Sequence, residues 1–249
     1  MRETPAARNV GAEFIGTLLV MLGGPGVLVL GGPDVGTLGV AFGFGAAIAI
    51  SIGVIGAVAN PMFSLALLLT RGITVTEAVS DWIGQFLGAI AGGLLIFGMN
   101  DLSRFSTGTN GWEPTSSLAP QLTGFATLGT VIAAELLVGT IVTVVLLSSI
   151  SQQRENSAVA AFTGLAYGFG SLVLLGVSGS GINPARSIGA ALLADTDPNA
   201  LGQVWLFLVL PIVSALAGVF VWLAIDDATI DDTVFDDTIL EDAVDAITD

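Results

Sequence analysis

Two Asn-Pro pairs hold the residue types and the spacing that matter most in this sequence. Asn60-Pro61 and Asn183-Pro184 stand 123 residues apart. Asn suits the cap of a helix and Pro suits its first turn, so each pair predicts the start of a helix. Because an Asn amide also carries two N–H donors, each pair predicts polar donors at the point where its helix begins.

The helices that these pairs begin are too short to cross a membrane. The apolar stretches 61–70 and 184–194 hold ten and eleven residues, which cover about 15 Å at 1.5 Å per residue. That length is about half of the hydrocarbon thickness of a bilayer. We therefore expect two re-entrant half-helices.

Six longer apolar stretches surround the half-helices. Of the 249 residues, 53% are hydrophobic and only 11% are charged, a charged fraction well below that of soluble domains. Each stretch has 20 or more residues, enough to span a bilayer as a helix. The stretches lie at about 10–30, 37–58, 77–98, 125–149, 158–178 and 201–225. The sequence therefore predicts an all-α membrane protein with six transmembrane helices plus two half-helices.

The two halves of the chain resemble each other. Ala12-Glu13 in the first half matches Ala134-Glu135 in the second, at nearly the offset of the Asn-Pro pairs. Because each half has an odd number of spans, the second copy must enter from the opposite side. This arrangement is an inverted repeat, whose functional site lies between the copies. Repeat one is expected at about 10–98 and repeat two at about 125–225, within one domain at 1–225.

Cysteine and histidine are both absent. Their absence excludes disulfides, cysteine-based zinc sites, thiol nucleophiles and Ser-His-Asp triads. It also removes the usual general base near neutral pH. We expect a protein that is not an enzyme and that has no metal site and no cofactor.

The acidic residues gather at the C-terminus. The net charge is −15, and ten of the 21 acidic residues lie in 226–249. We expect this segment to be a disordered tail. It either solubilises the protein, or it binds a partner or acts as a gating segment. Such acidity repels nucleic acid. Together with the absence of Lys, it resembles the composition of proteins from salt-adapted organisms.

The arginines indicate the orientation. If the N-terminus is cytoplasmic, Arg2, Arg8, Arg71 and Arg154 fall inside and Arg104 falls outside. This distribution satisfies the positive-inside rule, and an even number of spans then places the C-terminus inside too.

The segments before the half-helices, 53–59 and 178–182, predict a passage. Irregular backbone persists at membrane depth only where protein or a water-filled cavity satisfies it. Two half-helices that meet N-terminus to N-terminus bring about half a positive charge each. Cations and protons then face a barrier that neutral molecules do not. Asn60 and Asn183 would aim donors into this passage; the alternative is that they only cap helices.

The sequence around the two pairs resembles a known family. Residues 181–187 read Gly-Ile-Asn-Pro-Ala-Arg-Ser, and residues 56–62 read Gly-Ala-Val-Ala-Asn-Pro-Met. Both are similar to the signature motifs of aquaporins, the major intrinsic protein family. The motif residues besides the asparagines are Pro61, Met62, Pro184 and Ala185, with Met62 where Ala is usual.

The resemblance covers about 10–225 and implies a function. It implies a channel in the plasma membrane that passes water, or another small neutral solute such as glycerol, through each subunit of a homotetramer. A secondary transporter built on the same inverted repeat is the distant alternative.

The resemblance also implies an outer selectivity filter. Arg186 is a charge at membrane depth, and we expect it to donate hydrogen bonds to the solute and to repel cations. Ser171 and Ser180 match two further filter positions, although Ser171 could instead serve close helix packing. Phe42 matches the aromatic position, with Val40 as the alternative. Two serines would leave a wider opening than the His of strict water channels.

Glu13 and Glu135 are acids at matching positions of the two repeats. In the family, such carboxylates accept hydrogen bonds from the re-entrant loops, and we expect the same role here. The competing interpretation is a proton relay, but the chain has neither His nor Lys to complete one.

Overall fold

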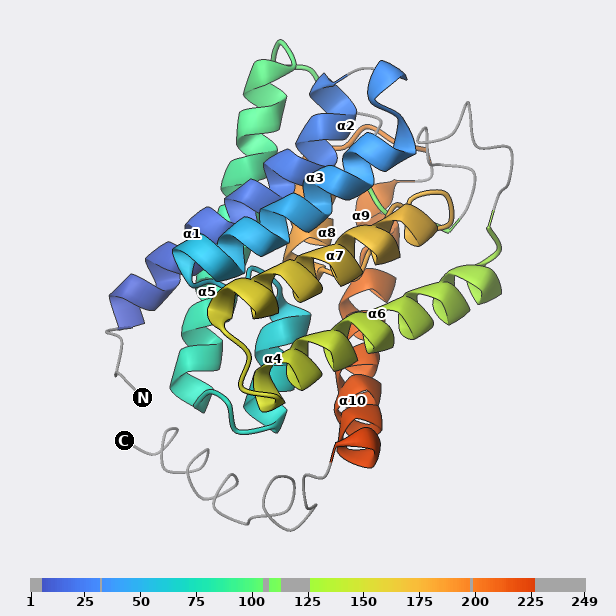
Figure 1. Cartoon of the computed structure of the whole chain (residues 1–249). Helices are drawn as coiled ribbons and strands as arrows, with labels where there is room; N and C mark the ends of the chain where they lie inside the picture. The colour runs from blue at the N-terminus through green and yellow to red at the C-terminus, as the bar shows by residue number, and fades with distance from the viewer. Residues whose placement is uncertain (1–5, 32, 105–107, 113–125, 198, 227–249) are drawn as a thin grey trace, which may run out of the picture.

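The computed structural model describes residues 6–31, 33–104, 108–112, 126–197 and 199–226 (Figure 1). Within those residues all regular secondary structure is helical. The long helices are α1 (Ala6–Met21), α3 (Gly36–Ile50), α5 (Val75–Met99), α6 (Leu128–Ser151), α7 (Asn156–Leu174) and α10 (Leu206–Ile225). The short ones are η1 (Leu22–Gly26), α2 (Val27–Leu30), η2 (Pro33–Val35), η3 (Ser51–Ile55), α4 (Pro61–Leu69), α8 (Pro184–Ala191) and α9 (Ala200–Gln203).

These helices form six candidate membrane spans, which confirms the predicted number. The spans are Asn9–Leu30, Gly36–Ile55, Val75–Met99, Leu128–Ser151, Asn156–Leu174 and Ala200–Ile225. Each is long and apolar enough to cross a bilayer. The first continues from α1 through η1 and α2, and the second continues from α3 into η3. By contrast, α4 has 9 residues and α8 has 8, so neither can span.

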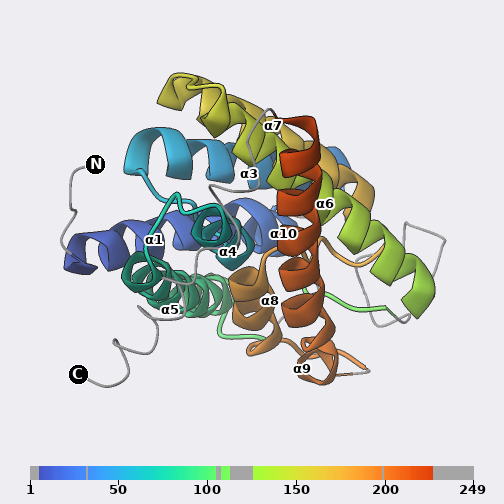
Figure 2. The same ribbon diagram turned by 90° about the horizontal axis from the view of Figure 1, so that it is seen from below.

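The long helices pack in pairs around the two half-helices, α4 and α8. The pairs are α1 with α5, α3 with α7 and α6 with α10. Figures 1 and 2 show α4 and α8 inside this bundle, where α4 packs on α5, α6 and α10 and α8 packs on α1, α5 and α10.

Small residues allow the helix pairs to approach closely. A Cβ atom on Gly88 of α5 would lie 2.2 Å from the carbonyl oxygen of Phe14 on α1. A Cβ atom on Gly45 of α3 would lie 2.6 Å from the carbonyl oxygen of Gly164 on α7. Because lipid is as apolar as a helix surface, close packing of this kind stabilises helix pairs in membranes.

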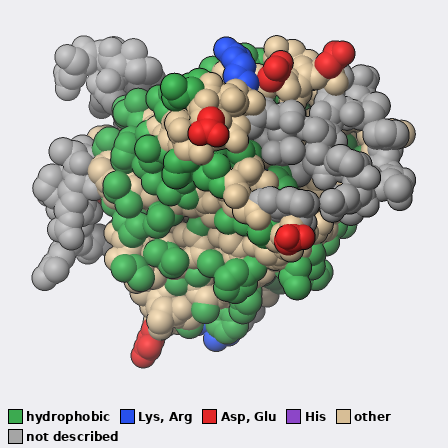
Figure 3. Space-filling model, turned by 90° about the horizontal axis from the view of Figure 1, so that it is seen from above, with side chains coloured by type: hydrophobic (Ala, Val, Ile, Leu, Met, Phe, Trp, Pro, Cys, Tyr) green, Lys and Arg blue, Asp and Glu red, His purple; other side chains and the backbone are tan. Residues whose placement is uncertain are grey.

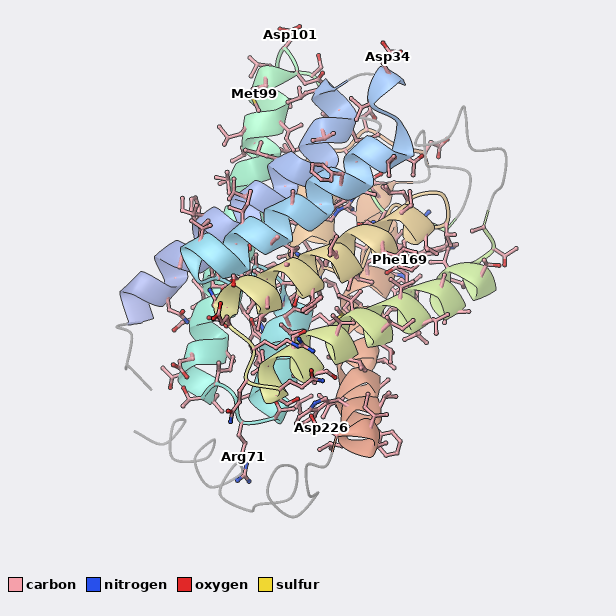
Figure 4. The ribbon with its side chains drawn as sticks, viewed as in Figure 1. Asp34, Arg71, Met99, Asp101, Phe169 and Asp226 are labelled. Carbon is pink, nitrogen blue, oxygen red and sulfur yellow. The ribbon has the colours of Figure 1, made fainter. Side chains whose placement is uncertain are left out.

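The outer surface is that of a membrane protein. Large apolar side chains point outward on several spans, such as Leu38 (71% exposed), Val54 (81%) and Phe220 (74%). Figure 3 shows hydrophobic side chains over much of the visible surface and few charged groups. The charged residues labelled in Figure 4 lie at the two ends of the molecule, Asp34 and Asp101 at one end and Arg71 and Asp226 at the other. An apolar body between two polar ends fits a bilayer.

Some predictions fall on residues outside the described part. The acidic tail predicted at 226–249 is described only at Asp226, and Arg2 lies outside as well. The long connection predicted at 99–124 is described at 99–104 and 108–112.

Candidate functional site

The two Asn-Pro pairs begin helices in the same way. Asn60 has extended backbone, and its Oδ1 accepts a hydrogen bond of 3.0 Å from the Met62 N–H. Asn183 is also extended, and its Oδ1 accepts one of 3.1 Å from the Arg186 N–H. Both asparagines therefore cap their helices through the side-chain oxygen, and the side-chain NH2 of each is left for a second task.

That second task joins the two half-helices at their N-termini. The Nδ2 of Asn60 donates to the carbonyl oxygen of Ile182 at 3.0 Å, and the Nδ2 of Asn183 donates to that of Ala59 at 2.8 Å. Both asparagines are fully buried. The half-helices thus meet head to head, and since each amide has two N–H groups, each keeps one beyond this bond.

The loops before the half-helices adopt left-handed backbone. Gly56 and Gly179 have φ of 78° and 83°, and the non-glycine residues Ala59 and Ser180 have φ of 53° and 64°. Left-handed backbone is strained for a residue with a side chain and persists only where the surroundings hold it. Something must therefore fix Ala59 and Ser180 in place.

Glu13 holds the first loop. Its two carboxylate oxygens accept hydrogen bonds from the backbone N–H of Val58 (2.7 Å) and of Ala59 (2.8 Å). Its side chain is only 2% exposed. Glu13 reaches the loop from α1, so the first span carries the support for the half-helix that follows the second.

Glu135 holds the second loop from α6. One carboxylate oxygen accepts from the Gly181 N–H at 2.7 Å and from the Ser178 hydroxyl. The other oxygen is buried and has no hydrogen-bond partner in the described part of the chain. The structure therefore places both predicted acids against the loops of their own repeats.

A polar chain extends the first support toward the end of α5. Gln85 donates to Glu13 at 2.8 Å and to the Ser64 hydroxyl at 2.9 Å, and Ser64 in turn donates to Asp81 at 3.0 Å. Asn9 donates to the other Asp81 oxygen at 2.5 Å. Our sequence analysis missed Asp81 and Gln85, although polar residues four apart on an apolar helix are a recognisable signal.

Arg186 is fully buried beside the meeting point. Its Nη2 donates to the carbonyl oxygen of Gly179 at 2.9 Å, and its Nη1 donates to the Oδ1 of Asn110. Asn110 comes from the connection between α5 and α6 and also donates to the Ser178 carbonyl at 3.3 Å. The Nε of Arg186 is buried without a partner among the described residues.

The two serines lie together near Arg186. The hydroxyls of Ser171 and Ser180 are 2.9 Å apart and hydrogen-bonded, and both residues are fully buried. Ser180 belongs to the same loop as Gly179, which binds the Arg186 guanidinium. The structure thus brings together three of the four residues that the resemblance implies for the filter.

The prediction that Phe42 lines the filter is wrong. Phe42 is 74% exposed on the outer surface, whereas the Phe44 ring is fully buried with its centroid 5.3 Å from the Arg186 guanidinium carbon. Residues two apart on a helix differ by about 200° in direction, so the two rings face opposite ways. Val40, the alternative, is buried one turn from Phe44 on the same face.

Met62 lies behind the asparagines. It is buried, and with Pro61, Pro184 and Leu208 it lines an apolar groove of about 400 Å³ between α4, α5, α8 and α10. Its sulfur lies 3.4 Å from the position that a Cβ atom of Gly139 would take. The larger side chain at this motif position therefore occupies space at the rear of the half-helix.

Comparison with known proteins places this architecture in a family. The sequence model described as Major intrinsic protein matches residues 1–222. The chain belongs to the major intrinsic protein family. It is therefore a membrane channel and not an enzyme.

Relatives of this major intrinsic protein include proteins named as aquaporins and a protein named as a glycerol uptake facilitator. It is 33% identical to "Aquaporin Z" of Brucella melitensis, over 86% of this chain and 96% of that one. It is 30% identical to "Glycerol uptake facilitator protein-like 6" of Lactiplantibacillus plantarum, over 86% and 95%. Its fold is similar to that of the aquaglyceroporin from Plasmodium falciparum, with a TM-score of 0.73 at 20% identity, covering 89% of this chain and 97% of that one.

Proposed function

We propose that this channel conducts water along a passage that runs past the Asn60–Asn183 pair and the Arg186 filter. The observation that supports this most is the pair of reciprocal bonds between the asparagines and the opposite loops. They hold two helix N-termini against each other at membrane depth. Each asparagine retains an N–H that can bind the oxygen of a passing water molecule.

Charge at this point supports the exclusion of ions. Each half-helix contributes about half a positive charge at its N-terminus, and Arg186 adds a full one nearby. Because the site is buried, these charges are weakly screened. A cation or a proton therefore meets a barrier that a neutral molecule does not.

Burial of the filter favours water as the main substrate. Ser171, Ser180 and Arg186 have no solvent-accessible surface, and neither do the two asparagines. Side chains packed this closely need to move least for the smallest neutral solute, which is water. The two serines favour glycerol or another small neutral molecule as the second candidate, because their small side chains leave more room than a ring.

Osmotic flux in proteoliposomes tests the proposal. Stopped-flow light scattering should show water permeability well above that of empty vesicles, with a low activation energy. Ser171→Trp should abolish most of this flux, because an indole at a buried filter position fills the passage. Phe169→Trp is the matched control, because Phe169 lies two residues away on α7 (labelled in Figure 4) and is 68% exposed. Wild-type flux no higher than that of empty vesicles contradicts the proposal.

The assembly and orientation are part of the same proposal. The family resemblance supports a homotetramer in the plasma membrane, which native mass spectrometry measures directly. The arginines support cytoplasmic termini, because Arg71 and Arg154 precede the third and fifth spans. A cysteine introduced at either position should react with a membrane-impermeant reagent only from inside.

The lack of Lys supports a protein adapted to high salt, whose thermal unfolding temperature should rise with salt concentration.

A further inference from the structure

One face of α7 carries hydroxyl groups along the proposed passage. Thr163, Tyr167 and Ser171 are spaced four residues apart, so they lie on one side of the helix, each about 6 Å from the next. All three are fully buried. The hydroxyls of Thr163 and Tyr167 have no hydrogen-bond partner within the described residues. Buried polar groups are nearly always paired, so these two mark places where a solute hydroxyl or water can bind.

Tyr167 stands between the filter and the asparagine pair. Its ring centroid lies 5.9 Å from that of Phe44, which covers Arg186, and 6.2 Å from that of Phe63, the third residue after Asn60. Its hydroxyl faces the side chain of Asn183, without a hydrogen bond of normal geometry. The ring therefore reaches from the filter level toward the level of the motif asparagines.

The side chains at this level leave no opening for a water-sized sphere. Tyr167, Asn60, Asn183 and Arg186 all have 0% exposure, which a lumen open to water at this level would not allow. Ser171 and Ser180 also have 0% exposure, but they have small side chains that are bonded to each other, so they fill little of the space at this level. The bulky group on this side is the Tyr167 ring.

We propose that Tyr167 forms a second constriction below the filter and sets the largest solute that the channel admits. This inference rests on the proposed function, since it assigns a size limit within the same passage. The ring packs against Phe44 and Phe63, which resist its displacement. A water molecule needs only a small movement of the ring and gains its unpartnered hydroxyl as a binding group. A glycerol-sized molecule must push the ring out of its packing.

Two variants separate the ring from its hydroxyl. Tyr167→Leu removes the ring. The ratio of glycerol to water permeability should then rise by about tenfold or more, because the barrier to displacing a packed ring slows glycerol by at least about that factor. Tyr167→Phe keeps the ring, and its ratio should stay within about threefold of wild type. Phe169→Leu makes the same ring-to-leucine change on the outer face of α7 and should leave the ratio unchanged.

The outcomes distinguish this inference from the proposed function. If wild type conducts water and Tyr167→Leu keeps the wild-type ratio, the constriction is refuted while the channel function stands. If wild type matches empty vesicles and Tyr167→Leu conducts, the ring is a plug rather than a size limit, and both the proposed function and the inference are overturned. If neither conducts, both are overturned. A circular-dichroism melt of each purified variant shows whether it folds, and Tyr167→Met is the replacement if the leucine variant does not.

Discussion

Removal of the Glu13 carboxylate should loosen the first re-entrant loop. In Glu13→Ala, the N–H groups of Val58 and Ala59 lose acceptors that lie 2.7 and 2.8 Å away. A buried donor left without a partner costs about 1–3 kcal/mol, so the two together should cost about 2–6 kcal/mol. Gln85 loses one acceptor but keeps its bond to Ser64, so it adds little to this sum.

The loss is measured as a thermal shift of the purified protein in detergent. For chains of this size, 1 kcal/mol corresponds to roughly 2–4 °C. The unfolding temperature of Glu13→Ala should therefore fall by at least about 4 °C. Water permeability should fall as well, because Ala59 carries the carbonyl that binds Asn183. In Glu13→Gln, one oxygen still accepts, so about half of the thermal loss should return.

Glu155→Ala is the matched control for this series. Glu155 is an exposed acid at the start of α7 and makes no side-chain cap bond. Surface changes of that kind alter stability by about 0.5 kcal/mol or less. If Glu13→Ala unfolded within about 1 °C of the control and conducted water normally, the supporting role of the carboxylate would be refuted.

Two further predictions use matched residues elsewhere in the chain. Asn110→Ala removes a hydrogen-bond acceptor from the buried Arg186 charge. Such a bond is worth about 1.5–3 kcal/mol, so the unfolding temperature should fall by about 3 °C or more. The control Asn100→Ala loses one exposed bond to Ser103 and should barely change the unfolding temperature. Gly88→Ala places a Cβ atom 2.2 Å from a backbone oxygen of α1 and should destabilise by about 1–3 kcal/mol, whereas Gly98→Ala, with nothing within 4 Å, should stabilise by up to about 1 kcal/mol. Equal melting curves for the two glycine variants would contradict the close packing of α1 and α5.

The spans and half-helices were predictable because simple lengths decide them. A run of about 20 apolar residues has few alternatives to crossing a bilayer, and the Asn-Pro pairs state where the two short helices begin. The ends were less predictable. We predicted a span at 37–58, but it ends at Ile55, because the left-handed Gly56 stops the helix.

The filter shows where matching a motif along the sequence falls short. We assigned Phe42 by its match to the aromatic position of the family's second helix, and such a match does not fix which face of the helix the ring occupies. In the structure Phe42 points outward and the buried Phe44 ring lies over Arg186, because residues two apart on α3 face opposite ways. Asn110 was invisible to this approach, because a residue in a long connection has no periodicity to place it.

The reciprocal bonds of the asparagines also bear on how the protein is made. Asn60 depends on a carbonyl that belongs to Ile182, and Asn183 depends on one that belongs to Ala59. When only the first three spans have been synthesised, Ile182 does not yet exist, and the side-chain amide of Asn60 has no carbonyl partner in the second half of the chain. Folding of the first half is then finished by the arrival of the second, so a truncated product that stops before Ile182 should be a substrate for membrane quality control.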